Sequence, residues 1–336
     1  MVQEPRMESA DFDRVKSQLE GVMTSDQGMP SYVAQVSFLM AAYGPKHPYA
    51  YPSKGTLKSL NQLDLPRVKQ AHHQNFGPNN AALIIVGDAK MADVKKLAKT
   101  IFGSWKKINY VPQKMPAPVV KKHMETHLVS RPHTPQTYLL VGQPVATAQD
   151  KDLASLEVFQ GILAGLPSSR LDGNLREKKG WTYGVGSTVN PLRGLGPMMI
   201  SSSIQVPFGA DALGEILKEF EVLKKEPIAD EELKAAKEGL LHSFASRYST
   251  VEKIAGNVAN RFVYDLSSDY DEKYYNRIHT VSKEDMMAIA QRVFNKEKMV
   301  AVAVGELEVM QVPLGTMDVG KVSVEMEEKT EEKPSN

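Results

Sequence analysis

The chain has 336 residues, enough for two domains of ordinary size, and 42% of them are hydrophobic, enough to bury a substantial core. Its 41 basic and 40 acidic residues nearly cancel, which argues against a protein that binds nucleic acid or another polyanion. The chain has no cysteine, so disulfides and thiolate metal sites are excluded.

The sequence contains no apolar run long enough for a transmembrane helix, for which about 18 residues are needed. Its start, MVQEPRMESADFDR, is polar and lacks the apolar stretch of a signal peptide. If the natural protein is exported, we expect its leader to lie outside this sequence. A cysteine-free chain suits an oxidising compartment such as a periplasm, but it suits a cytosol equally well. We predict a periplasmic protein, with a cytoplasmic one as the alternative.

The first half of the chain reads as helices around one strand. Residues 8–23 predict a helix with one apolar face, and 30–43 predict a second, strongly apolar helix. A Gly- and Pro-rich loop (44–56) leads to a helix at 64–76, for which Asp64 is the expected N-cap. AALIIVG (81–87) predicts a buried strand, and 92–105 another helix. Residues 106–122 hold three prolines and several lysines, and we interpret them as an interdomain linker.

The second half adds more strands. Residues 123–129 and 137–145 have strand character, a helix is expected at about 151–164, and 198–206 predict another strand. Helices fill 209–294, and the strand 299–305 closes the domain. We therefore predict a partial first domain (1–105), the linker (106–122), a complete second domain (123–310) and a tail (311–336) whose charged end is disordered.

The two halves resemble each other at constant spacing, which favours a tandem duplication over chance. The predicted fold class is therefore α+β: a tandem repeat of mixed β-sheet units backed by helices, with the first repeat incomplete at its front. The matched pairs are Phe76 and Phe294, Val86 and Val304, Gly87 and Gly305, and, at a slightly larger spacing, Phe12 and Leu233, Lys16 and Lys237, Leu19 and Leu240, Ala34 and Ala255, and Tyr43 and Tyr264.

The segment SRLDGNLREKKGWTYGVGS (169–187) carries the strongest functional signal. Leu171 and Leu175 predict one apolar face of a helix that stops at Gly180, and a strand is expected from Trp181 onward. An Arg near the helix end and a Tyr near the strand start could donate hydrogen bonds to peptide carbonyls. Spacing alone favours a plainer interpretation, a surface Arg and a Tyr that plugs the core edge.

This segment resembles the second-domain signature of insulinase/pitrilysin-type zinc peptidases, S-R-L-x-x-x-L-R-E-K-x-G-x-x-Y. The preceding HPYAYPSKGT and AALIIVGD also look like the family's first domain, so the resemblance covers about residues 5–308. The signature's Arg and Tyr fall on Arg176 and Tyr183, and the resemblance implies that this pair contacts substrate. The closest group is the non-catalytic subunit of bacterial heterodimers, whose partner carries the zinc motif.

The family's zinc chemistry needs H-x-x-E-H, and this motif does not occur in the chain. The duplication places the first repeat's version before residue 1, and the second repeat's counterpart, around Leu156–Gln160, has no His. In catalytic members a later helix carries two Glu residues seven positions apart, and the second of them is the third zinc ligand. The matching positions here are Val15 and Val22. Glu20 is nearby and two residues too early. The resemblance therefore implies a parent protein without catalysis of its own.

The histidines offer no better metal site. His123 and His127 are four residues apart, but in a strand this spacing separates them by roughly 13 Å. His72 and His73 are expected on the polar face of a helix, and His47 in a structural turn.

We therefore expect no catalytic residue, metal ligand or cofactor on this chain, with zinc held by a homologous partner subunit. The expected function is binding of a peptide substrate through Arg176 and Tyr183, within a zinc endopeptidase that degrades or processes peptides. We expect neither nucleic acid nor a membrane span among its contacts. Two alternatives stay open: a fragment of a complete zinc peptidase whose motif lies upstream of residue 1, and a structural, peptidase-like subunit that binds only partners.

Overall fold

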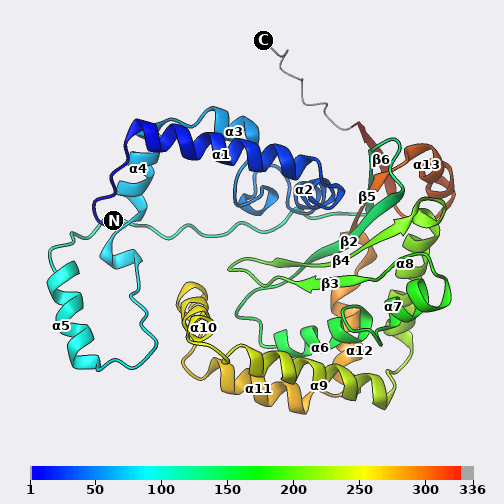
Figure 1. Ribbon diagram of the computed structural model, residues 1–336. Helices are drawn as coiled ribbons and strands as arrows, with labels where there is room; N and C mark the ends of the chain where they lie inside the picture. The colour runs from blue at the N-terminus through cyan, green and yellow to red at the C-terminus, as the bar shows by residue number, and fades with distance from the viewer. Residues whose placement is uncertain (1, 327–336) are drawn as a thin grey trace, which may run out of the picture. The chain divides into compact units, whose positions relative to one another are not determined.

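The computed structural model describes residues 2–326, and these contain one six-stranded sheet (Figure 1). The strand order is β3-β4-β2-β5-β1-β6. Neighbours from β3 to β5 are antiparallel, whereas β1 runs parallel to both β5 and β6. The α+β class predicted from the sequence is confirmed. The strands are β1 (Glu125–Ser130), β2 (Gln136–Ala146), β3 (Gly186–Val189), β4 (Gly196–Gln205), β5 (Val300–Gly305) and β6 (Lys321–Met326).

Helices cover both faces of the sheet, which explains why every residue of β5 (VAVAVG) is buried. One face packs against α2 (Pro30–Tyr43), whose Phe38 and Tyr43 lie in a cluster with the valines of β5. The other face carries α6 (Leu153–Leu163), α8 (Gly209–Lys225) and α12 (Lys283–Val293) (Figure 1). There Phe294 stacks on Phe220 with ring centroids 3.7 Å apart and contacts Phe159 at 5.4 Å.

The helix boundaries support the duplication. The spacing that relates Lys16 to Lys237 also relates the first residues of α1 and α9 and both ends of α2 and α10. Lys16 Nζ donates to the carbonyl oxygens of Asn61 (3.3 Å) and Leu63 (2.8 Å). Lys237 Nζ donates to those of His279 (2.7 Å) and Val281 (2.9 Å). Equivalent lysines thus make equivalent contacts in the two repeats. The helices are α1 (Ser9–Gln27), α9 (Asp230–Ser246) and α10 (Val251–Tyr264).

The remaining helices follow local sequence signals. Asp64 caps α4 by accepting from the Arg67 amide at 2.8 Å, as predicted. The other helices are α3 (Leu57–Asn61), α4 (Leu65–Asn75), α5 (Met91–Phe102), α7 (Arg170–Asp172), α11 (Tyr270–Thr280) and α13 (Leu307–Thr316), and the short helical turns are η1 (Pro48–Ala50), η2 (Pro78–Asn80), η3 (Gly173–Lys178), η4 (Val206–Phe208) and η5 (Lys296–Lys298).

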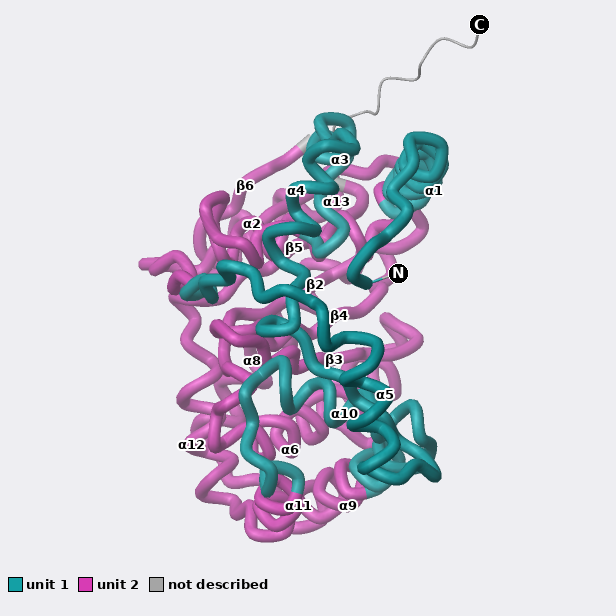
Figure 2. Tube along the Cα trace, turned by 90° about the vertical axis from the view of Figure 1, so that its left-hand side faces the viewer, with its two compact units in different colours: residues 1–26, 52–115, 242–271 teal, residues 27–51, 116–241, 272–336 magenta. Residues whose placement is uncertain are grey.

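The chain divides into two compact units that each combine distant segments (Figure 2). Unit 1 comprises residues 1–26, 52–115 and 242–271, and unit 2 comprises 27–51, 116–241 and 272–336. The sheet and its covering helices belong to unit 2. These units are defined by contacts in space, whereas the predicted domains are defined by sequence repeats. The predicted domain boundaries at residues 105 and 123 therefore stay a prediction.

One predicted strand is absent from the described residues. AALIIVG (81–87) has no strand partner, and the side chains of Leu83 and Ile85 are 55% and 49% exposed. Its counterpart in the second repeat, β5, lies between β1 and β2. The expectation of a buried strand was wrong because an apolar run becomes a central strand only when flanking strands satisfy its backbone.

Part of the predicted tail is folded. Residues assigned to it form most of α13 and all of β6, which pairs in parallel with β1 from Glu125 to Ser130. The Thr126 hydroxyl also donates to the Val319 carbonyl at 2.7 Å. The charged residues in KVSVEM made this segment look unlike a strand in the sequence. An edge strand tolerates such charges. The remainder of the predicted tail, 327–336, lies outside the described residues.

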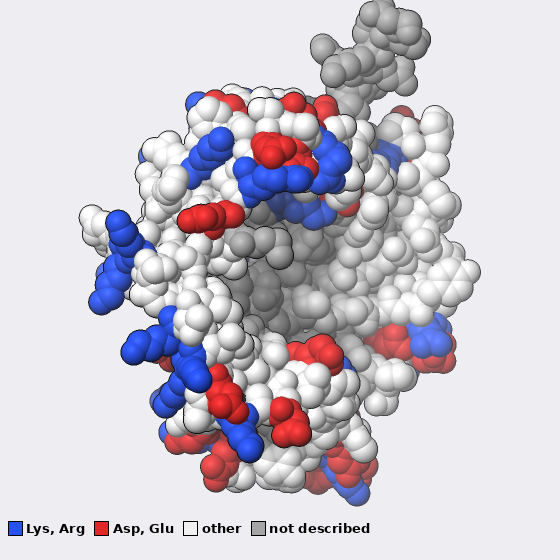
Figure 3. Space-filling model, turned by 60° about the vertical axis from the view of Figure 1, so that its left-hand side comes forward, with Lys and Arg blue, Asp and Glu red and all other residues white. Residues whose placement is uncertain are grey.

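Charges of both signs intermingle on the surface. On the face drawn in Figure 3, Lys and Arg side chains lie among Asp and Glu side chains, without a broad field of one sign. This agrees with the near-zero formal charge of the chain. A nucleic-acid-binding face would gather basic residues along one side.

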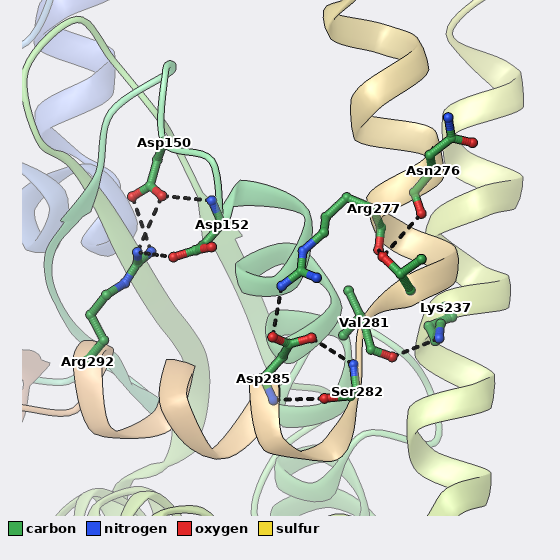
Figure 4. A network of polar contacts seen from close by, with 10 residues as sticks. Asp150, Asp152, Lys237, Asn276, Arg277, Val281, Ser282, Asp285 and Arg292 are labelled. Atoms are coloured by element: carbon green, nitrogen blue, oxygen red, sulfur yellow. Dashed lines mark hydrogen bonds and ion pairs between the residues drawn. The ribbon is translucent and has the colours of Figure 1, made fainter.

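Ion pairs and caps fasten α12 beneath the sheet (Figure 4). Ser282 and Asp285 form a reciprocal capping box, and Arg277 donates to Asp285 at 2.8 Å. Near the other end of α12, Arg292 contacts the carboxylates of Asp150 (3.2 Å) and Asp152 (3.3 Å) ahead of α6. These contacts fix α12 and α6 together, and α6 in turn contacts α7, the start of the candidate site.

Candidate functional site

The predicted Arg–Tyr segment begins on a helix held by two other helices. In α7, Leu171 is fully buried, as is Leu175 in η3, which confirms the predicted apolar face. Arg170 Nε and Nη2 donate to the two carboxylate oxygens of Glu232 on α9 at 2.6 and 2.9 Å. Its Nη1 reaches Glu219 on α8 at 3.1 Å. These contacts fix the orientation of α7, where the Arg–Tyr segment begins, relative to α8 and α9.

The acidic partners of this helix are held ionised. The hydrogen bond from Arg170 lowers the pKa of Glu232 below its usual value, against the opposing effect of burial. A hydrogen bond from the Asn174 amide lowers the pKa of Glu215 in the same way, with Lys179 and Lys218 adding to the effect. Both carboxylates are therefore charged at neutral pH and stabilise the site helix.

The helix ends in a widened turn. Over η3 the chain adopts π-helical geometry, and the Lys179 amide donates to the Asn174 carbonyl at 3.1 Å. Gly180 then takes a left-handed conformation with φ +65, and its amide donates to the Arg176 carbonyl at 3.0 Å. The predicted stop at Gly180 is confirmed. Single π turns of this kind recur at functional sites, where they re-aim side chains.

Past Gly180, the chain lies on β4 and is fastened there on both sides of Tyr183. The Gln205 amide donates to the Trp181 carbonyl at 2.9 Å, and Trp181 stacks on Phe208 with ring centroids 5.0 Å apart. The Thr182 hydroxyl is buried and contacts the Ser202 hydroxyl (2.8 Å) and two backbone carbonyls. The segment is therefore a fixed loop joined to the sheet.

Tyr183 projects from this fastened loop, and its side chain is 91% exposed. That exposure excludes the plainer interpretation in which the tyrosine plugs the core edge. The expected strand from Trp181 is wrong in its start, because β3 begins only at Gly186. Before it, Thr182 forms a single bridge to Ile204. A rigid loop, rather than a strand, presents the phenol to solvent.

Arg176 lies in η3, and its side chain is 46% exposed. Its Nη1 donates to Asp172 Oδ2 at 3.3 Å, and its Nε lies 3.4 Å from the exposed carboxylate of Glu177. The other oxygen of Asp172 accepts from the Val185 amide at 3.2 Å. The structure therefore joins the two predicted residues through Asp172, whose carboxylate contacts Arg176 and the chain just after Tyr183. Sequence reasoning missed Asp172, although its spacing of four from Arg176 marked a possible ion pair.

Helix α6, which the sequence analysis matched to the expected zinc-binding helix through the duplication, has a structural role. In α6, Leu156 is fully buried in the core. Gln160, one turn later, donates from Nε2 to the Ser187 carbonyl of the edge strand β3 at 2.9 Å. The side chains at these two positions therefore pack the core and hold the edge of the sheet.

The other residues considered as metal ligands in the sequence have different surroundings. Among residues 2–326, no group of three or more His, Cys, Asp or Glu side chains could hold a metal ion. Val15 and Val22 are largely exposed on α1. His127 lies in β1, as predicted, with Nδ1 2.9 Å from Glu325 Oε1, and His47 has the predicted turn role, accepting from the Tyr49 amide. The expectation that zinc belongs to a partner stays a prediction.

The described part of the chain contains no helix that is both long enough and apolar enough to cross a membrane.

Comparison with known proteins points to one family. The family model described as the peptidase M16 inactive domain matches residues 62–240, more than half of the chain. An uncharacterized zinc protease of Bacillus subtilis, YmxG, is 26% identical over 263 residues, covering 76% of this chain and 61% of its own length. A non-peptidase homolog of Helicobacter pylori, also named YmxG, is 22% identical over 295 residues, covering 85% and 66%.

Among solved structures, a peptidase M16 inactive domain from Pseudomonas fluorescens is similar, with a TM-score of 0.83 and 26% identity. The similarity covers 91% of this chain and 73% of that one. The chain thus spans only part of the length of the proteins it matches.

Proposed function

Because this chain belongs to the M16 peptidase family and matches its inactive domain, we propose that it holds an extended peptide for a zinc endopeptidase and does not cut it. The observation that carries the proposal is Tyr183: a 91% exposed phenol on a loop whose backbone and neighbours are fastened to β4. Because the loop backbone is already fixed, a ligand that binds this side chain has to order only the side chain itself.

The chemistry of the pair supports a peptide ligand. Arg176 contacts Asp172 through one guanidinium nitrogen, so donors remain for carbonyl oxygens. The Tyr183 hydroxyl can donate to a second carbonyl, or to the oxyanion that develops when the peptide bond is attacked. In the proposed assembly, the partner's H-x-x-E-H residues would hold zinc, which would supply an activated water. The residues of this chain bind and orient the peptide.

The catalytic partner would be a homologous subunit that carries H-x-x-E-H, and its sheet edge would receive the peptide as an added strand. The outer edge of β3 in this chain is less suited to that task, because Gln160 already takes the Ser187 carbonyl. We place the assembly in the periplasm, which can be checked by fractionating cells that express the natural protein. Recovery with the cytoplasmic fraction would contradict this placement.

Direct binding tests the proposal. Fluorescein-labelled peptides from a casein digest, titrated with the purified chain, should show a rise in fluorescence anisotropy. Arg176→Ala and Tyr183→Ala should each weaken binding by about 1–3 kcal/mol, the range for a hydrogen bond to a charged group or an oxyanion contact. Lys178→Ala is the matched control, because Lys178 is also an exposed cation near the end of the helix. Equal affinity of all four proteins would contradict the proposal.

Turnover tests the division of labour. The chain alone should cleave no quenched peptide, whereas mixing it with an H-x-x-E-H homologue should produce activity that a chelator removes. The chain spans only part of the length of the relatives it matches, so each relative should also be assayed by itself as a single polypeptide. Chelator-sensitive activity that maps to a single longer polypeptide would favour the alternative of a complete zinc peptidase. Partner binding without any peptide binding would favour a structural subunit.

A further inference from the structure

Asp172 occupies an unusual place beside the candidate site. Its side chain is almost completely buried, yet it is a carboxylate. Burying a carboxylate costs free energy unless both oxygens find partners. Here Oδ2 accepts from Arg176 Nη1 at 3.3 Å and Oδ1 accepts from the Val185 amide at 3.2 Å. The two oxygens thus serve the two elements that carry the Arg–Tyr pair.

We propose that Asp172 is a positioning residue that couples Arg176 to the Tyr183 loop, so that the pair meets a peptide as one preformed unit. This inference rests on the proposed function. Asp172 itself would not touch the peptide, because its side chain is nearly inaccessible to solvent and its two oxygens already accept from Arg176 and the Val185 amide.

Asp172 adds an anchor at one of the two ends of the loop. Before Tyr183, the chain is held by the Thr182 hydroxyl and the Trp181 carbonyl. After Tyr183, Gly184 is bonded to the hydroxyls of Thr182 (3.2 Å) and Ser202 (2.8 Å), and the Val185 amide bonded to Asp172 anchors the chain just before β3 begins. A backbone that is fixed on both sides of Tyr183 limits the conformational entropy lost on binding to that of the side chain, which favours affinity.

Arg176 depends on the same carboxylate for its orientation. The other acidic contact of its guanidinium is Glu177, whose side chain is 62% exposed. An exposed ion pair of this kind orients a long side chain only weakly. Asp172 presents a fixed, buried oxygen instead, which selects among the rotamers of Arg176 and leaves the remaining guanidinium donors outward.

The two arms can be separated by substitution. Asp172→Asn keeps an oxygen for the Val185 amide but turns an NH₂ donor toward Arg176, so it breaks only the arginine arm. Asp172→Ala breaks both arms. Glu177→Gln is the matched control, because it alters the exposed acidic contact of the same guanidinium. The chain has two tryptophans, Trp105 and Trp181, so a Trp105→Phe background makes Trp181 the sole fluorescent reporter of the loop.

We measure the anisotropy titration with fluorescein-labelled casein peptides, and acrylamide quenching of Trp181 without peptide. Asp172→Asn should weaken binding by about tenfold, or roughly 1.4 kcal/mol, and leave quenching unchanged. Asp172→Ala should weaken binding at least as much and also raise quenching. Glu177→Gln should change affinity by less than about twofold. In an Arg176→Ala background, Asp172→Asn should cause no further loss, because it acts through the missing guanidinium.

The outcomes separate the inference from the function on which it rests. If Arg176→Ala and Tyr183→Ala weaken binding but Asp172→Asn does not, positioning by Asp172 is overturned and peptide binding stands. A full, additive loss from Asp172→Asn in the Arg176→Ala background also overturns it. If neither Arg176→Ala nor Tyr183→Ala weakens binding, the proposed function itself fails. Should Asp172→Ala not fold, Asp172→Asn and the double variant still decide the arginine arm.

Discussion

At the scale of single residues, the site combines one exposed side chain with buried neighbours that hold it. Thr182 is 8% exposed and Tyr183 is 91% exposed, although they are adjacent in sequence. The threonine hydroxyl contacts the carbonyls of Gly184 (3.0 Å) and Ser203 (2.9 Å) and the hydroxyl of Ser202. The residue that stabilises the loop is therefore different from the residue whose side chain is exposed to solvent.

This separation predicts opposite outcomes for two conservative substitutions. Thr182→Val should lower the free energy of unfolding by about 1–3 kcal/mol, because it leaves the buried partners of the hydroxyl unsatisfied. Tyr183→Phe should change it by less than about 0.5 kcal/mol, since only an exposed hydroxyl is lost. Urea unfolding followed by circular dichroism measures both. A larger loss for Tyr183→Phe than for Thr182→Val would contradict the description of the loop.

At the scale of elements, the helix that carries Arg176 ends where the backbone becomes left-handed at Gly180. Its orientation is fixed by the ion pairs of Arg170. Gly180 has φ +65 and Gly173 has an ordinary helical φ of −59, and a Cβ at either would meet no atom within 4 Å. The two glycines therefore differ in conformation and not in available space.

Alanine at the two positions should have effects of opposite sign. Gly180→Ala should destabilise the chain by about 1–2 kcal/mol, because a Cβ is strained in the left-handed region. Gly173→Ala should stabilise it by roughly 0.5–1 kcal/mol, since alanine loses less backbone entropy in a helix. Thermal unfolding of the two variants side by side provides the measurement. Destabilisation by both would mean that space, rather than φ, limits these positions.

The Arg170–Glu232 pair should make stability depend on pH. The hydrogen bond from Arg170 lowers the pKa of Glu232 in the folded chain. Its contribution is therefore fully present above the pKa of an unfolded glutamate, about 4.3, and is lost as the pH falls through the lower folded value. Glu232→Gln should cost about 1–3 kcal/mol at neutral pH, and its difference from wild type should shrink below about pH 4.

Urea midpoints measured across this pH range test the pair. Glu231→Gln is the control, because Glu231 is exposed on the same turn of α9. A difference between Glu232→Gln and wild type that stays constant down to low pH would show that the lost contact is not ionic.

At the scale of the whole molecule, the two repeats each contain a lysine with the same kind of backbone contact. Lys16 and Lys237 each donate to two carbonyl oxygens that end the segment ahead of α4 or α12. These two lysines were matched by sequence spacing alone, and their contacts are the structural confirmation of that match.

Removing either lysine should therefore cost similar amounts. Lys16→Met and Lys237→Met should each lower the free energy of unfolding by about 1–3 kcal/mol, because carbonyl partners lose a charged donor. Lys234→Met, at an exposed position of α9, should change it by less than about 0.5 kcal/mol. Urea unfolding again serves as the measurement. No loss for Lys237→Met would indicate that water replaces the ammonium.

The amino-acid sequence by itself determined the features that rest on local signals. The apolar stripe of Leu171 and Leu175, the cap at Asp64 and the stop at Gly180 appear where spacing and turn chemistry placed them. The Arg176–Tyr183 spacing carried the family resemblance, and the repeated residues carried the duplication. Such signals act over a few residues or by direct comparison of segments, so they need no knowledge of long-range contacts.

Only the tertiary structure decided features that depend on distant partners. AALIIVG and VAVAVG look alike in sequence, but only the second has β1 and β2 beside it, so only the second forms a strand. β6 became a strand because β1 offered an open edge. Asp172 joined the site because folding brought the Val185 amide to its carboxylate. Strand pairing and the hydrogen bonds of a buried carboxylate depend on residues that lie far apart in sequence. The folded core brings these residues together, so no local sequence pattern predicts the contacts.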